Sequence, residues 1–188
     1  MTPPAVVVLV EGASDAAVVR VLNEARGLGV MPPEVELRDM GGVTNVGRHL
    51  RALDGATSVL GLCDAPEERF VVRGLRSAGH PVGSRDDLEQ IGFWVCDRDL
   101  EDELIRALGP DRVEAVLDEL GELDRFRAFQ RQPQWRGRPV GDQLRRFAGT
   151  ASGRKLTLAR RLAEELAPGT TPRPLASLVD AIADRAAR

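Results

Sequence analysis

One short segment near the start of the chain constrains the fold more than any other. Residues 5–10 read Ala-Val-Val-Val-Leu-Val, a continuous apolar run with four valines. A run of this length without polar alternation is typical of a strand that is buried on both faces. Such strands occupy the centre of parallel sheets that carry helices on both sides. The segment therefore predicts a central strand of an α/β fold.

Turn and helix signals follow this strand, and the alternation repeats over the first hundred residues. Glu11-Gly12 turns the chain, and Ser14 is in position to N-cap a helix whose apolar residues recur at helical spacing. Further elements are predicted as strand 35–37, helix 44–53, strand 58–63, helix 67–78 and strand 91–96. This order predicts a mostly parallel sheet of about four strands with right-handed crossovers.

From Leu100 onward the sequence is helical, with breaks at 109–110, 121, 133–139, 149–153 and 168–174. The chain of 188 residues, 43% of them hydrophobic, is long enough for one substantial core. We predict an α/β core over residues 1–108 and a C-terminal helical extension over residues 109–188 that packs on it.

The composition excludes several kinds of site. The two histidines, His49 and His80, are far apart, so a paired-histidine metal site is absent, and without tyrosine no tyrosyl–DNA intermediate can form. No P-loop motif is present. Cys63 and Cys96 lack the spacing of zinc or redox motifs, so we expect reduced core residues. No apolar run approaches the roughly 20 residues of a membrane span and no signal peptide is evident, so we expect a cytoplasmic protein without membrane contact.

Charge is distributed unevenly along the chain. Residues 1–124 contain 12 Arg and 24 acidic residues, whereas residues 125–161 contain 10 Arg and one Lys against Asp142 alone. An acidic block followed by a basic one suits a cation site beside a surface for a polyanion backbone, with a solvated basic helix face as the alternative for the basic block. The residues expected to contact phosphate are Arg131, Arg136, Arg138, Arg145, Arg146 and Arg154.

Acidic residues follow three of the predicted strands. Glu11 follows the first, Asp64 the third, and the fourth is followed by Asp97, Asp99, Glu101, Asp102 and Glu103. The carboxyl ends of parallel strands meet at one edge of the sheet, and carboxylates gathered there repel one another unless a hard cation neutralises them. Each acid alone is explained by the helix dipole, but the set predicts a site for one or two Mg²⁺ ions.

Lys155 is the only lysine, against 25 arginines. Arginine cannot release its proton at working pH, whereas lysine can act as a compact charge on phosphate or as a tuned acid or base. The exception therefore indicates a chemical role, with chance as the alternative.

The motifs together resemble those of Toprim domains and of the overcoming-lysogenization-defect (OLD) nucleases. Residues 8–15 (VLVEGASD) resemble the opening Toprim motif, and residues 60–64 (LGLCD) resemble the second. Residues 99–104 (DLEDEL) resemble the third acidic motif of OLD nucleases, and residues 152–156 (SGRKL) resemble the segment of their late lysine. The matches extend from about residue 5 to residue 160.

The resemblance implies a Rossmann-like Toprim fold that cleaves DNA with Mg²⁺ or Mn²⁺. By position it makes Glu11 and Lys155 catalytic, with Lys155 stabilising the transition state. The metal ligands that it implies are Glu11, Asp15, Asp64, Glu101 and Glu103.

Two features depart from the family pattern. Asp64 is followed by Ala65-Pro66 where the motif continues Asp-x-Asp, which leaves Glu67 or Glu68 as a substitute. OLD nucleases also carry an ATPase, for which this sequence has no motif, so the expected partners are nucleic acid, DNA before RNA, and a separately encoded ATPase. The leading hypothesis is a metal-dependent endonuclease. Two alternatives stay open: a noncatalytic module that binds nucleic acid or a partner, favoured by Pro66, and another Toprim chemistry such as RNA maturation or nucleotidyl transfer.

Overall fold

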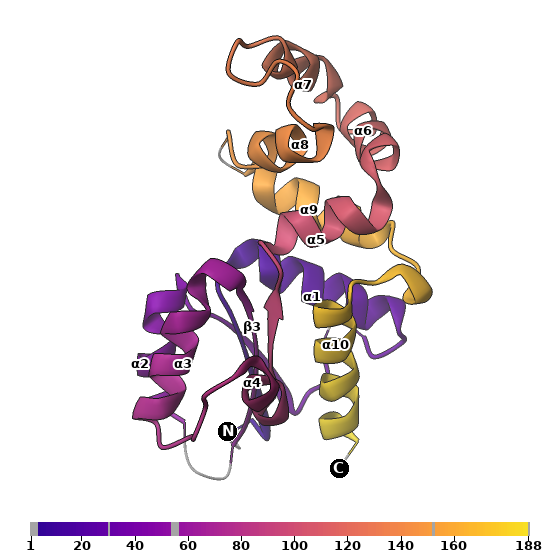
Figure 1. The fold of residues 1–188 in the computed structure, drawn as a ribbon. Helices are drawn as coiled ribbons and strands as arrows, with labels where there is room; N and C mark the ends of the chain where they lie inside the picture. The colour runs from indigo at the N-terminus through magenta and orange to yellow at the C-terminus, as the bar shows by residue number, and fades with distance from the viewer. Residues whose placement is uncertain (1–3, 30, 54–56, 152, 188) are drawn as a thin grey trace.

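The computed structural model describes residues 4–29, 31–53, 57–151 and 153–187. Its centre is a four-stranded, all-parallel sheet in the order β2-β1-β3-β4 (Figure 1). The strands are β1 (Val6–Val10), β2 (Val35–Asp39), β3 (Ser58–Asp64) and β4 (Phe93–Cys96). The predicted sheet is therefore confirmed, with the apolar run of residues 6–10 as a central strand.

Helices cover both faces of the sheet, and the strands alternate their side chains between them. Val6, Val8 and Val10 of β1 belong to one buried cluster, and Val7 and Leu9 belong to the other. The first face packs against α1 (Ala13–Ala25) and α10 (Arg173–Ala186), and the second against α2 (Val46–Arg51), α3 (Glu68–Ser77) and α4 (Arg85–Ile91). Burial on both sides explains why the strand has no polar alternation.

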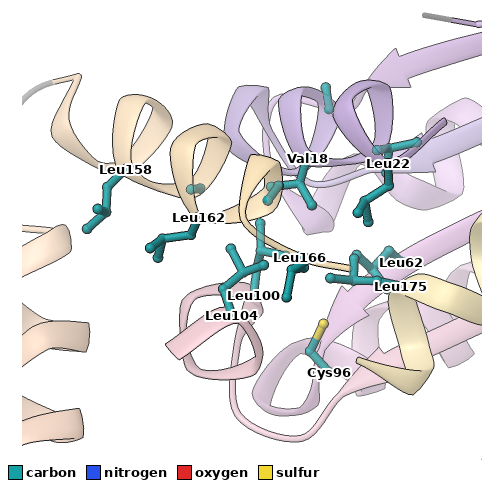
Figure 2. Close-up of a cluster of buried hydrophobic side chains, with 14 of the residues drawn as sticks. Val18, Leu22, Leu62, Cys96, Leu100, Leu104, Leu158, Leu162, Leu166 and Leu175 are labelled. Atoms are coloured by element: carbon teal, nitrogen blue, oxygen red, sulfur yellow. The ribbon is translucent and has the colours of Figure 1, made fainter. Parts of the chain in front are cut away.

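The remaining helices form a lobe at the edge where the strands end (Figure 1). They are α5 (Leu100–Leu108), α6 (Pro110–Glu119), α7 (Leu123–Gln130), α8 (Val140–Ala148) and α9 (Arg154–Glu164). Helix α9 packs against α1 and α5, so the apolar core continues from the sheet into the lobe. Figure 2 shows Val18 of α1, Leu104 of α5 and Leu162 of α9 within this cluster. The C-terminal part of the chain is thus helical, as predicted, and its last helix, α10, returns to pack beside β3 and β4.

Short 3-10 turns join several of these elements: η1 (Val43–Asn45) precedes α2, η2 (Ala65–Glu67) precedes α3, and η3 (Pro168–Thr170) precedes α10. The helix predicted over 44–53 is therefore split between η1 and α2. In the part of the chain that the structure describes, no helix combines the length and apolarity needed to cross a bilayer. Cys63 and Cys96 are buried free thiols, as expected.

Two local predictions were wrong. The strand predicted over 91–96 begins only at Phe93, because the preceding residues form α4, which the prediction omitted. Ser84 begins that helix: its hydroxyl accepts the Asp87 N–H at 3.2 Å, while the Asp87 carboxylate accepts the Ser84 N–H at 2.9 Å. Gly92, with φ of +105°, ends it in a left-handed conformation that favours glycine.

The N-cap of α1 was also misassigned. The helix begins two residues earlier than expected, at Ala13, with Gly12 as its N-cap and Ser14 buried inside its first turn. The Asp15 carboxylate accepts the Gly12 N–H at 3.1 Å and so satisfies one of the donors at the start of the helix.

Candidate functional site

The ends of β1 and β3 bring three carboxylates together. Glu11 directly follows β1, Asp64 is the last residue of β3, and Glu67 closes the turn η2. One oxygen from each of these side chains lies within 4.8 Å of the other two. Glu67, which the sequence offered only as a substitute for a missing second aspartate, is thus a member of this group.

Pro66 shapes the turn that carries Glu67. The backbone at Asp64 is extended, and the proline lies in the first turn of η2, where a missing N–H costs no hydrogen bond. Pro66 therefore occupies a position that needs no acidic side chain, and Glu67 supplies the carboxylate from the next residue.

Two further acids border the same edge. Asp15 lies in the first turn of α1, and Glu101 lies in the first turn of α5, where it is buried. Lys155, at the start of α9, places its Nζ 3.2 Å from Oε2 of Glu101. We call these five acids, Glu11, Asp15, Asp64, Glu67 and Glu101, the carboxylate cluster.

Burial, and next to it repulsion between neighbouring carboxylates, raises the pKa values of four acids of the cluster: Glu11, Asp15, Asp64 and Glu101. Burial raises the pKa of Asp64 to about 8, and the charges of Asp15, Asp99 and Glu11 add to this shift. Burial and the neighbouring Glu67 carboxyl raise the pKa of Glu11 to about 7. Burial raises the pKa of Asp15 to about 6 against the opposing charge of Lys155. The cluster therefore has an excess of negative charge that a cation would relieve.

Lys155 remains a cation in this setting. Burial lowers its pKa, but the charge of Glu101 and the hydrogen bond to it outweigh burial, so the net shift is upward. The packing of α9 against α1 brings residue 155 next to the carboxylate cluster, whose acids come from far earlier in the chain. Of the motif that contains it, Ser152 lies outside the described residues.

Two carboxylate oxygens of the cluster fit a metal site particularly well. Oε1 of Glu101 and Oε2 of Glu67 are buried without a hydrogen-bond partner among the described residues. A buried anionic oxygen without a donor is costly, and a hard divalent cation is the partner that such oxygens accept. The donor set, composed of carboxylate oxygens, suits Mg²⁺ or Mn²⁺.

The acids next to this cluster in sequence have other contacts. Oε1 of Glu103 accepts the Asp97 N–H at 2.9 Å, and its Oε2 lies 3.0 Å from Nη2 of Arg106. Asp102 pairs with Arg98 and Arg106 at 3.2 and 2.9 Å. The structure thus brings together Glu11, Asp15, Asp64 and Glu101 of the five implied ligands, and it places the Glu103 carboxylate among arginine-paired acids.

Asp99 lies between the two groups. Its Oδ1 accepts the Asp102 N–H at 2.9 Å and caps α5, while Oδ2 pairs with Arg145. Its charge also contributes to the raised pKa values of Asp64 and Glu101. Asp99 belongs to the acidic set from which the sequence predicted a Mg²⁺ site, but the ligands implied by the resemblance do not include it.

The predicted phosphate-contacting arginines fall into two sets. Arg145 pairs with Asp99, and Arg154 pairs with Glu122 at 2.8 Å while its guanidinium lies 4.0 Å from the centre of the Phe147 ring. The other four are exposed and, within the described residues, have no acidic partner: Arg131, Arg136, Arg138 and Arg146. They lie on α8 and the segment between α7 and α8.

No family model matches the sequence, and no curated protein matches it. Solved structures do. The C-terminal region of the Xanthomonas campestris pv. campestris OLD protein, phased with platinum, matches 98% of this chain and 94% of its own at 22% identity and a TM-score of 0.75. The structure phased with mercury covers 100% and 98% at 20% identity and a TM-score of 0.72. The C-terminal region of the Burkholderia pseudomallei OLD protein covers 97% and 98% at 17% identity and a TM-score of 0.69. The chain therefore has the fold of OLD C-terminal regions.

Proposed function

We propose that this chain, with the fold of OLD C-terminal regions, is an endonuclease that hydrolyses phosphodiester bonds of DNA with Mg²⁺ or Mn²⁺. One observation carries the proposal: carboxylates from the ends of β1 and β3 and from the start of α5 meet beside a single lysine ammonium group. Strongly perturbed carboxylates at the carboxyl edge of a parallel sheet are typical of functional sites.

Each member has a role that follows from its contacts. Glu11, Asp64 and Glu67 would hold one cation, with Asp15 and Glu101 facing a second. When bound, such ions polarise the phosphate and lower the pKa of a coordinated water. Glu11, as a ligand of the first cation, would lie next to the water that this cation activates.

Lys155 acts as a fixed positive charge rather than as a base. Its pKa is raised, so the ammonium group persists at working pH, and its half-exposed side chain can reach a phosphate held at the mouth. A preorganised ammonium group stabilises negative charge that develops on the phosphate in the transition state.

The exposed arginines near α8 would contact the DNA backbone without reading sequence. A cytoplasmic location would give the protein access to DNA, and a separately encoded ATPase remains the proposed protein partner. Pro66 is compatible with this proposal, because Glu67 would supply the carboxylate that the second aspartate of the Asp-x-Asp pattern provides.

The test is incubation of the purified chain with supercoiled plasmid and with RNA in Mg²⁺, Mn²⁺ or EDTA. We expect nicked or linear plasmid with either metal and none with EDTA. The Asp64→Asn variant controls for contaminating nucleases. Plasmid that stays supercoiled with both metals, or equal cleavage by Asp64→Asn, contradicts the proposal.

A further inference from the structure

Arginines without an acidic partner also gather on the core, far from the basic segment of the sequence. Six exposed arginines of the described chain pair with Asp or Glu, whereas those of α3 have no carboxylate oxygen within 4.0 Å. We call Arg69, Arg73 and Arg76 the α3 arginine row. Helix α2, which packs against α3, adds the exposed and equally unpaired Arg48 and Arg51.

The helical spacing places the row on one face. Residues 69, 73 and 76 are separated by four and three positions, so their side chains share the solvent face, while Val71 and Leu75 are buried on the other. At 1.5 Å per residue the row is about 10 Å long. One strand of duplex DNA has a phosphate about every 3.4 Å along its axis, so the row spans roughly three phosphates.

The row lines an open groove beside the turn that carries two acids of the carboxylate cluster. This groove has a volume of about 680 Å³, and its lining includes the three arginines and also Ala65 and Pro66, which lie between Asp64 and Glu67 in the sequence. Arg69 lies two residues after Glu67, whose carboxylate belongs to the cluster. A phosphate backbone bound along the row would therefore end at the carboxylates.

Close backbone packing holds the row in place. A Cβ atom added to Gly74 of α3 would lie 2.9 Å from Cγ1 of Val46 and 3.1 Å from the backbone nitrogen of Gly47, both in α2. The two helices can approach this closely because residue 74 lacks a side chain. The surface is consequently formed before any ligand arrives, which limits the entropy lost on binding.

Helices α2 and α3 are locally basic, although they lie within the acidic block of residues 1–124. In α2 and α3, all of whose residues the structure describes, Glu68 is the sole acidic residue, and it pairs with Arg85 at 2.9 Å. Five arginines of this helix pair thus remain available to a polyanion. Phe70 is partly buried with the Arg69 guanidinium 4.8 Å from its ring centre, so the face offers no exposed aromatic platform for stacking single-stranded bases.

We propose that the α3 arginine row binds the backbone of duplex DNA on the core side of the carboxylate cluster, opposite the arginines near α8. The inference rests on the proposed function for its choice of polyanion, but it assigns a binding surface that this function does not require. DNA would then be held from both sides of the cluster, by the core and by the helical lobe.

The test is the salt dependence of duplex affinity, measured by fluorescence anisotropy in EDTA so that no cleavage occurs. The variant is Arg69→Gln with Arg73→Gln, which leaves the Arg76 hydrogen bond to the Val82 carbonyl intact. The control with equal charge change is Arg160→Gln with Arg173→Gln, two highly exposed arginines on α9 and α10. Melting curves test whether both variants fold. If the double row variant does not fold, the single Arg73→Gln variant replaces it.

We expect the slope of log affinity against log salt to be less steep by about 2 in the row variant, because each lost phosphate contact removes about 0.9. The row variant should also bind about 10-fold more weakly at roughly 100 mM salt. The control should change the slope by less than about half as much. An unchanged slope in the row variant, an equal change in the control, or no duplex binding by the parent chain overturns the inference. An unchanged slope is also the result expected if the row contacts an acidic protein instead. Duplex binding with the expected slopes but without metal-dependent cleavage supports the row and refutes the proposed function.

Discussion

Two groups of acids lie beside the carboxyl ends of the same strands, and they differ in what neutralises them. Asp97, Asp102 and Glu103 contact Arg85, Arg98 or Arg106 at distances from 2.9 to 3.8 Å. The carboxylate cluster contains more acids, yet within the described residues its acids form one ion pair, that of Glu101 with Lys155. The comparison teaches that acid placement alone does not define a site; the supply of counter-charge does.

The consequences of this difference appear in the pKa values. In the cluster, the pKa of Asp64 is raised to about 8 and that of Glu11 to about 7, and burial is the largest cause of both shifts. Ionisation of these acids therefore costs more free energy in the folded protein than in water. Such a cost is typical of groups that serve a function. The arginine-paired acids serve packing instead, since their charges are satisfied within the fold.

The sharpest contrast is expected between Asp64→Asn and Glu103→Gln. Asp64→Asn should reduce metal-dependent DNA cleavage by about 10³-fold, because it removes the central ligand of the cluster. Glu103→Gln should stay within about 10-fold, because that carboxylate already binds Arg106 and the Asp97 N–H. Cleavage rates on a labelled oligonucleotide measure both. Equal losses in the two variants would mean that the resemblance is right to make Glu103 a ligand and that the contrast drawn from the contacts fails.

Lys155→Ala should lower the cleavage rate by about 10²-fold while leaving the fold and metal binding intact. The reason is that Lys155 is the cation placed at the cluster mouth. Lys155→Arg should restore little, since a guanidinium group differs in shape from a compact ammonium group. Single-turnover kinetics decide the matter, with Arg160→Ala as a matched control on the outer face of α9. An Ala variant that cleaves within about threefold of the parent contradicts the assignment.

The raised pKa values also predict how stability depends on pH. Because the folded-state pKa values of Asp64, Glu11 and Asp15 lie above their unfolded values near 4, the metal-free protein is stabilised when these acids are protonated. Stability should fall as pH rises from about 5 to 8.5, by roughly 2 kcal/mol after allowance for solvent screening, or about 4–8 °C in Tm.

Asp64→Asn should flatten this pH dependence, and millimolar Mn²⁺ should restore the Tm of the parent chain at high pH. The control is Asp97→Asn, which lies at the end of β4 but is exposed and pairs with arginine. Thermal melts across the pH range measure the effect. A Tm that rises with pH between 5 and 8 would contradict the raised pKa values.

The smallest effect concerns the basic surface of the lobe. Arg146→Ala should weaken duplex binding by about threefold and reduce the salt slope by about 1, because Arg146 is exposed without an acidic partner. Arg145→Ala should change the slope less, because Arg145 is engaged by Asp99. Anisotropy titrations at several salt concentrations compare the two. A larger slope change for Arg145 would show that this ion pair opens on DNA.

Much of the fold was predictable because its strands have a local signature. The apolar runs of β1, β3 and β4 and the acids that follow them indicated a parallel sheet with a charged edge. Helix α4 was missed because its signal is a short polar capping box, Ser84 to Asp87, rather than an apolar repeat. Glycine at 61 had a tertiary cause, since an added Cβ would lie 2.3 Å from the Phe93 ring on the neighbouring strand.

The site was predictable only in outline. Glu11, Asp64 and Lys155 were named from the sequence, but the roles of Glu101 and Glu103 could not be separated, because two residues on one helical turn differ in the direction of their side chains and not in type. Which acids meet arginine depends on long-range packing, such as the contact of Arg145 with Asp99, and no local pattern reports it.

The most direct test of the central claim is isothermal titration of the purified chain with Mn²⁺ at pH 7.5. It compares the parent chain with Asp64→Asn and with Asp97→Asn, whose carboxylate lies at the end of β4 but pairs with arginine. We expect the parent and Asp97→Asn to bind Mn²⁺, and Asp64→Asn to lose about 10-fold or more in affinity. The reason is that the acids of the cluster lack a counter-charge, whereas Asp97 is already paired with arginine. No Mn²⁺ binding by the parent at millimolar concentration, or equal binding by Asp64→Asn, would contradict the claim.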